Sequence, residues 1–144
     1  QNIAQGVAVH ESFGSVVAML VEVSSSGRDY TVHRVVCAID CGRVINPDTV
    51  VQQMEGGIIY GLTAAMKTPV IIRDGACGQS NFHDLPVLRI NESPPVIDVH
   101  IVNSDEAPGG VGEVAVPPIA PALAHAIFVA TGKRLRSLPL ILHA

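Results

Sequence analysis

The sequence predicts an α+β fold in which two helices pack on one face of a mainly antiparallel sheet. Short runs of β-branched residues, separated by turn residues, fill its first forty positions. Two later segments instead repeat apolar residues at the three- and four-residue steps of a helix. The 144 residues suffice for a single domain, and a composition of 48% apolar and only 3% aromatic residues predicts a core of Val, Ile, Leu and Ala.

Strands are predicted throughout the first forty residues. Residues 1–10 read as a chain that is already entering a strand, which is expected of a fragment of a longer protein. Residues 15–23 are dense in Val and Leu, and the turn residues of "SSSGRD" follow them. Residues 30–39 then resume the β-branched pattern, so the economical interpretation is a local hairpin.

The first helix is predicted to begin after Asn46, whose side chain can cap it. Pro47 suits the first helical position, and Asp48 suits the positive end of the helix dipole. Apolar residues then recur at helical spacing, namely Val50, Met54, Ile58, Leu62, Ala65 and Met66.

Three glycines, Gly56, Gly57 and Gly61, interrupt this helix, and each costs about 1 kcal/mol relative to alanine. One explanation is close packing of the helix against the sheet, which needs a face of small residues. The other is that a ligand or another backbone approaches this surface, with Gln53 beside it as a polar contact. The two explanations are compatible, because one glycine face can serve either purpose.

A mostly irregular segment follows the first helix. A short strand at 69–72 and an Asp74-Gly75 turn are predicted, after which the chain lacks regular patterning as far as Pro95. Irregular segments of this length are uncommon in compact domains unless they have a function. His83 and Asp84 lie within it, and a loop can carry such a pair into a cleft, so they are candidates for the substrate side of a site.

One strand and one helix are predicted near the C-terminus. Residues 96–102 alternate as a half-buried strand, whose core face carries Ile97, Val99 and Ile101. Pro117 or Pro118 starts the last helix, and Gly132 is suited to end it. The buried stripe of this helix is predicted to contain Ile119, Leu123, Ile127 and Ala130.

Charge and hydropathy argue against two classes of partner. The net charge is −4, and no basic stripe is available to neutralise the phosphates of a nucleic acid. No apolar run has the length of a membrane-spanning helix, and no signal peptide is recognised. The compartment stays open between bacterial cytoplasm and periplasm, because any export signal would precede residue 1.

The three cysteines do not predict a disulfide framework, because their number is odd and their spacing irregular. Cys37 and Cys41 lie four positions apart in a predicted strand, which separates them by roughly 13 Å. Each thiolate of a zinc site must lie about 2.3 Å from the metal. The pair therefore cannot share a zinc ion unless the chain turns between them, and no direct metal ligand is predicted.

The segment "APGGVGEVAVPP" holds a single acidic residue, Glu113, among three glycines and three prolines. Gly109, Gly110 and Gly112 permit positive φ angles and let a flat ligand approach the backbone. Burial among the neighbouring valines would raise the pKa of the Glu113 carboxyl, as a general base near neutral pH requires, whereas the following helix would lower it. A surface turn that happens to carry a glutamate is the alternative.

Three stretches together resemble one known family. "CAIDCGRVINPDTVVQQMEGGIIYGLTAA", "QSNFHDLPVLRINESP" and "GGVGEVAVPPIAPALAHAIFVATGKRLRSLPL" are similar to the C-terminal part of the molybdopterin-binding large subunit of the xanthine oxidase / aldehyde oxidase family. The resemblance is strongest to the branch of the isoquinoline 1-oxidoreductase β-subunits, which is close to bacterial aldehyde dehydrogenases of this family. It extends from "GVAVHESFGSVVA" to the C-terminus.

The resemblance implies a molybdenum hydroxylase that oxidises N-heteroaromatic or aldehyde carbons with a molybdenum-bound hydroxide. Glu113, in Val111-Gly112-Glu113, matches the glutamate that acts as the base. Gln53 matches a residue that bonds the molybdopterin, and the helix face at Gly56 and Gly57 would pack close by. The backbone of Gly112 would lie against the cofactor.

The sequence also departs from this family. Val114, Ala115 and Val116 stand where the branch usually has Pro-Gly-Thr, and His125 stands where Asn is common. The family's subunit is several times longer and works with an iron–sulfur subunit, so this chain is expected to be a C-terminal fragment, to bind cofactor weakly by itself, and to self-associate through surfaces that its missing parts should cover. A stand-alone, non-catalytic α+β binding or assembly module derived from the family is the alternative function.

Overall fold

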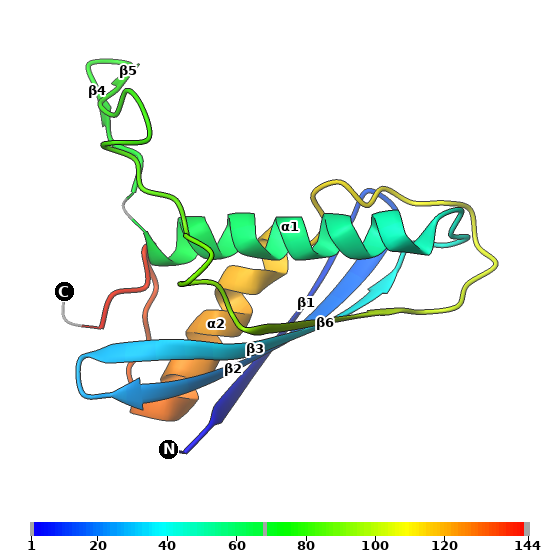
Figure 1. Ribbon diagram of the computed structural model, residues 1–144, viewed down its shortest axis with the longest axis horizontal. Helices are drawn as coiled ribbons and strands as arrows, with labels where there is room; N and C mark the ends of the chain where they lie inside the picture. Colours follow the sequence, from blue (N-terminus) through cyan, green and yellow to red (C-terminus); the bar gives the residue numbers. More distant parts are fainter. Residues whose placement is uncertain (1, 68, 143–144) are drawn as a thin grey trace.

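The computed structural model describes residues 2–67 and 69–142 and confirms the α+β class. Its main sheet has four strands in the order β1 (Ala4–Ser12), β2 (Ser15–Ser26), β3 (Asp29–Asp40) and β6 (Val96–Ile101), as Figure 1 shows. β2 is antiparallel to both of its neighbours, β1 and β3, whereas β6 is parallel to β3. The sheet is therefore mainly antiparallel, as predicted.

Both hairpins in the sheet have tight turns that need left-handed backbone. Phe13 and Gly14 join β1 to β2 with φ angles of 53° and 74°, and Ser12 pairs directly with Ser15. Two positive φ angles in a two-residue loop are the signature of a type I′ turn, which matches the twist of the flanking strands. Gly27, at φ 67°, turns the chain between β2 and β3.

The two helices begin and end close to the predicted residues. α1 (Pro47–Met66) starts after Asn46, whose side-chain oxygen accepts a hydrogen bond from the Thr49 amide at 3.2 Å. α2 (Val116–Thr131) starts one residue earlier than predicted and ends at Gly132, which has φ 74°. Both caps follow the expected chemistry.

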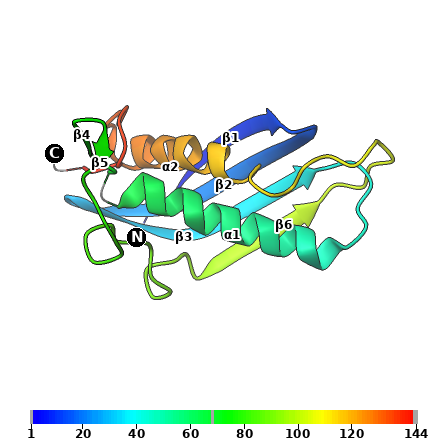
Figure 2. The ribbon, with the colours of Figure 1, turned by 90° about the horizontal axis from the view of Figure 1, so that it is seen from above.

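Both helices cover the same face of the sheet (Figure 2). α2 packs on β1 and β2, and α1 packs beside α2 and over β6. The core between the layers is aliphatic, and its fully buried side chains include Val17, Met19, Val21, Ile39, Met54, Ile58, Leu62, Ile119, Leu123 and Ile127. Ile97, Val99 and Ile101 of β6 face this core and are partly buried, as the alternation predicted.

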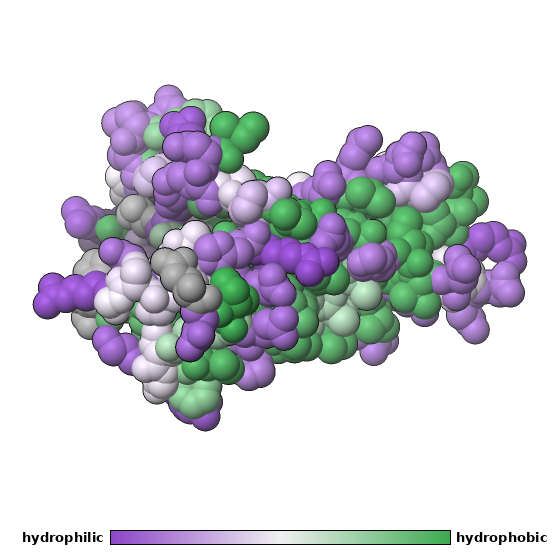
Figure 3. All heavy atoms as spheres, turned by 60° about the horizontal axis from the view of Figure 1, so that its bottom comes forward, coloured by the Kyte–Doolittle hydropathy of each residue, from purple (hydrophilic) through white to green (hydrophobic). Residues whose placement is uncertain are grey.

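The opposite face of the sheet carries exposed aliphatic residues. Val7 and Val9 of β1 are 52% and 66% exposed, and Val16 of β2 is 41% exposed. Figure 3, turned toward the underside of Figure 1, shows hydrophobic atoms over a large part of this side of the molecule. The expected exposed apolar surface is therefore present, and self-association through it stays a prediction.

The segment around residues 72–77 projects beyond the end of α1, and the chain then returns beside this helix, where Leu88 is buried (Figure 1). The predicted strand at 69–72 was wrong in extent, because β4 (Ile72–Arg73) and β5 (Ala76–Cys77) are two-residue strands that pair only with each other. The turn at Asp74 and Gly75 is confirmed, with φ angles of 50° and 78°. These strands are exposed, so no core packing extends them. None of the described helices could cross a membrane.

Candidate active-site cleft

A cleft of about 720 Å³ brings together the predicted catalytic and cofactor-binding residues. Gln53, Gly56 and Gly57 reach it from α1, and Gly112 and Glu113 reach it from the loop before α2. These two segments are far apart in the sequence. They meet because α1 and α2 pack side by side on one face of the sheet.

The Glu113 loop is attached to the sheet by backbone hydrogen bonds. The Gly109 amide donates to the Cys41 carbonyl at 2.9 Å, and the Gly110 amide donates to the Phe13 carbonyl at 2.8 Å. The Ser15 hydroxyl donates to the Gly110 carbonyl at 2.7 Å. The ends of β3 and of the β1–β2 hairpin therefore fix the position of this loop.

The glycines of this loop are needed for close approach. Gly109, Gly110 and Gly112 do not adopt the positive φ angles that glycine permits. A Cβ atom at Gly109 would instead collide with the Gly14 carbonyl, and one at Gly110 would lie 2.9 Å from the Phe13 Cβ atom. The loop contacts the hairpin turn so closely that neither position has room for a side chain.

The glycines around the cleft divide into two groups. A Cβ atom at Gly57 would lie 2.9 Å from that of Ala115, and one at Gly61 would collide with the Ile119 side chain. Added Cβ atoms at Gly56 and Gly112 would meet nothing within 4 Å. Both explanations from the sequence therefore hold, for different residues: packing requires Gly57 and Gly61, whereas Gly56 and Gly112 leave open space on facing walls of the cleft.

The Glu113 carboxylate is exposed to the cleft and unpaired among residues 2–67 and 69–142. The sequence left burial among the valines and an exposed surface turn as alternatives, and in the structure Glu113 is exposed. Val114 and Ala115 turn into the core, where they are 1% and 0% exposed, while Glu113 points away from it. The backbone carbonyl of Glu113 accepts a hydrogen bond from the Val116 amide at 3.0 Å, which ties the acid to the first turn of α2.

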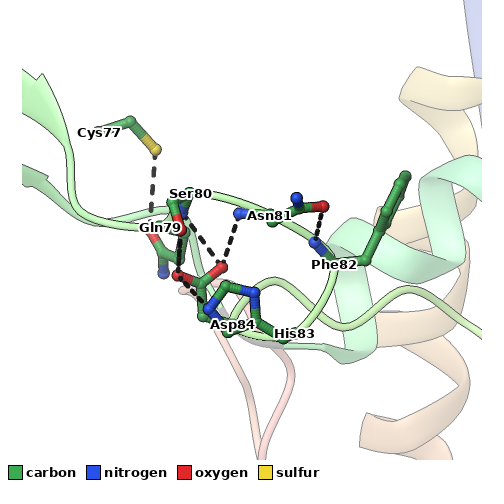
Figure 4. Close-up of polar contacts among 7 residues, drawn as sticks. All are labelled: Cys77, Gln79, Ser80, Asn81, Phe82, His83 and Asp84. Carbon is green, nitrogen blue, oxygen red and sulfur yellow. Dashed lines mark hydrogen bonds and ion pairs between the residues drawn. The ribbon is translucent and has the colours of Figure 1, made fainter.

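His83 and Asp84 do not line this cleft. Asp84 accepts hydrogen bonds from the amides of Ser80 and Asn81, each at 2.9 Å, within the irregular segment (Figure 4). These bonds, that from Asn81 foremost, lower the pKa of the Asp84 carboxyl. The His83 Nε2 atom lies 3.6 Å from an Asp84 oxygen. Asp84 organises a local turn, and a substrate role for this pair stays a prediction.

Cys37 is buried within β3 and faces the core. Burial raises the pKa of its thiol to about 11, so it stays protonated near neutral pH. Cys41 is also buried and Cys77 is exposed, and all three thiols are free. Within the described part of the chain, no group of three His, Cys, Asp or Glu side chains is arranged to hold a metal ion.

Six further residues line the cleft that the sequence did not single out as site residues: His10, Ser12, Phe13, Tyr60, Val116 and Pro117. His10 and Ser12 lie on the helix-covered face of β1, and Phe13 is in the β1–β2 turn. Because side chains alternate along a strand, His10 and Ser12 lie on the same face of β1. This face is open at these two residues because α2 does not extend over them. Tyr60 follows Gly56 by one helical turn and shares its face of α1.

Comparison with known proteins identifies the family. Residues 4–94 match the model of the molybdopterin cofactor-binding domain. The chain is 42% identical over 140 residues to the beta subunit of the isoquinoline 1-oxidoreductase of Brevundimonas diminuta, a match that covers 96% of this chain and 18% of that protein. It is 33% identical over 120 residues to a subunit of the nicotinate dehydrogenase of Pseudomonas putida, a match that covers 83% of this chain and 10% of that protein.

Solved structures agree on the fold. The aldehyde oxidoreductase of Desulfovibrio desulfuricans superposes on 87% of this chain with a TM-score of 0.73 and 26% identity, and the matched region is 14% of that chain. The aldehyde oxidoreductase of Desulfovibrio gigas gives a TM-score of 0.74 at 22% identity, again over 87% of this chain and 14% of that one. The chain belongs to the molybdopterin cofactor-binding domain family, as found in the molybdenum subunits of the xanthine oxidase family.

Proposed function

We propose that this chain forms the base-bearing part of the active site of a molybdenum hydroxylase. One observation carries the proposal: the unpaired Glu113 carboxylate faces the same cleft as the Gln53 amide, in a chain of the molybdopterin-binding family. The isoquinoline, nicotinate and aldehyde relatives suggest an electron-poor carbon of an N-heteroaromatic ring or an aldehyde as the reacting group.

The cleft suits the cofactor that the family implies. Gly56 and Gly112 leave open space on facing walls, so a flat group can approach both backbones. The Gln53 side chain offers two N–H donors and a carbonyl acceptor, which match the polar edge of a pterin. When bound, the molybdenum cofactor would supply the redox chemistry of hydroxylation.

Glu113 would act as the general base and accept a proton on its carboxylate while the oxygen nucleophile attacks. A base must be ionised and within hydrogen-bond reach of the proton that it removes. The carboxylate is exposed to the cleft and unpaired among the described residues, and the hydrogen bonds that fix its loop hold it at the cleft wall. Gln53 would orient the cofactor from the opposite wall on α1.

The complete catalytic unit would be larger than this chain, which spans 18% of the isoquinoline relative and 10% of the nicotinate relative. Both relatives are named as subunits. Further cofactor contacts would come from the rest of the molybdenum subunit, and an iron–sulfur subunit would carry electrons away. This chain alone would hold the cofactor weakly.

The proposal is tested by Glu113→Gln in the complete enzyme. Glutamine keeps the size of the side chain but is not a base at neutral pH, so kcat should fall by about 10² to 10⁴ while molybdenum and pterin content stay unchanged. Glu106→Gln is the matched control, because Glu106 is an exposed acid of the same loop and lies outside the cleft. Normal turnover in Glu113→Gln with full cofactor content would remove Glu113 from the mechanism.

A further inference from the structure

The face of β1 on which α2 packs changes from small to polar side chains along the strand. From the N-terminal end it carries Ala4, Gly6, Ala8, His10 and Ser12. α2 lies directly over the first part, where an added Cβ atom at Gly6 would collide with the backbone of Ala122 and Ala126. Past the first turn of α2 the face opens into the cleft, and there the small residues give way to polar ones.

The Ser12 hydroxyl has no hydrogen-bond partner among the residues that the structure describes. Among the described residues that are not exposed, its oxygen is the only buried side-chain nitrogen or oxygen without a hydrogen bond. Buried polar groups in native proteins are nearly always paired with protein, water or ligand. Ser12 lines the cleft, so its hydroxyl can reach a molecule that is bound there.

The first residues of α2 have no backbone N–H group that is free to bind a ligand in the cleft. The Val116 amide already donates to the Glu113 carbonyl, and Pro117 and Pro118 carry no N–H group. The first three residues of α2 therefore offer a ligand no backbone donor, and the side chains of His10 and Ser12 are placed to make hydrogen bonds in the cleft.

Two of the five aromatic residues of the chain line the same cleft and are mostly exposed. Tyr60 is 71% exposed on α1, and Phe13 is 68% exposed in the hairpin turn. Phe13 also has a positive φ angle of 53°, which is uncommon for a bulky residue. An exposed ring held in such a conformation beside a cleft suits contact with a flat ligand.

We propose that the tip of the β1–β2 hairpin binds a planar nitrogen heterocycle in the cleft. Ser12 donates a hydrogen bond to a ring nitrogen or oxygen, His10 provides a second polar contact, and Phe13 and Tyr60 contact the ring. This inference rests on the proposed function, and it assigns positioning residues beyond Glu113 and Gln53. The heterocycle is either the pterin of the cofactor or a heteroaromatic substrate.

The decisive variant is Phe13→Asn in the complete enzyme. Asn-Gly is the preferred sequence of a type I′ turn, so this change removes the ring while keeping or raising the melting temperature. Ser12→Ala removes the unpaired hydroxyl. Phe82→Asn and Ser26→Ala are matched controls, because Phe82 is 73% exposed and Ser26 is also exposed, and both lie outside the cleft.

Two measurements separate the two sources of the heterocycle. A several-fold loss of bound pterin in Phe13→Asn and Ser12→Ala, measured by fluorescence after its release, identifies the cofactor. Unchanged pterin content with about tenfold weaker binding of isoquinoline, measured by calorimetry, identifies the substrate. Unchanged pterin content and unchanged isoquinoline binding in both variants would overturn the proposal. The Glu113 test is independent, because it measures kcat at full cofactor content.

Discussion

Two pairs of glycines around one cleft have different physical reasons for being glycine. Gly57 and Gly61 lie between α1 and α2, where any side chain would press on Ala115 or Ile119. Gly56 and Gly112 face open space, so no contact within the described chain explains them. The first pair serves the core and the second is available to a ligand. The sequence alone does not distinguish the two pairs. They differ in what an added Cβ atom would contact, which only the structure shows.

The largest effect is expected at Gly6, another packing glycine. In Gly6→Ala the new methyl group would collide with the backbone of Ala122 and Ala126, which cannot move aside as a side chain can. We expect α2 to shift from β1 and the free energy of unfolding to fall by about 3 kcal/mol or more. Urea denaturation of the 144-residue chain measures this, and a loss below about 1 kcal/mol would contradict the close packing of α2 on β1.

A smaller loss is expected in Gly61→Ala. The added methyl group would press on the Ile119 side chain and lie 3.1 Å from the Val116 carbonyl oxygen. Overpacking should lower the free energy of unfolding by about 1–3 kcal/mol, and the higher helix propensity of alanine should offset about 1 kcal/mol of this loss. The net loss should therefore be about 1 kcal/mol in the same denaturation experiment. A more stable variant would show that α1 and α2 have room between them.

The opposite sign is expected in Gly56→Ala. The position is exposed within a helix and has no neighbour for the methyl group, so stability should rise by up to about 1 kcal/mol. In the complete enzyme the same variant should contain less pterin, because the methyl group enters the cleft. Glu55→Ala, a change at an exposed neighbour outside the cleft, is the control. Higher stability with unchanged pterin content would mean that no ligand approaches this surface.

Local patterns were sufficient to predict the regular elements. The cap at Asn46, the left-handed end at Gly132 and the alternation of β6 depend on residues within a few positions of one another, and each was confirmed. The exposure of Glu113 was not predictable in this way. It depends on Val114 and Ala115 turning into a core that residues from other elements complete.

The membership of the cleft was predicted only in part. The resemblance to a family singled out Gln53, Gly56, Gly57, Gly112 and Glu113, and the structure brings all five to one cleft. The hairpin residues His10, Ser12 and Phe13 were not among them. They line the cleft because the first turn of α2 does not reach the C-terminal end of β1. This depends on how two elements about a hundred residues apart in the sequence pack together.

The packing of Gly57 on Ala115, and of Gly61 on Val116 and Ile119, also sets the width of the cleft. Gln53 is carried by α1 on one side of this seam, and Glu113 precedes Ala115 by two residues on the other. A bulkier residue between the helices would move the two walls apart without touching anything bound between them. Selectivity for ligand size could therefore evolve through buried positions while every residue that contacts the ligand stays the same.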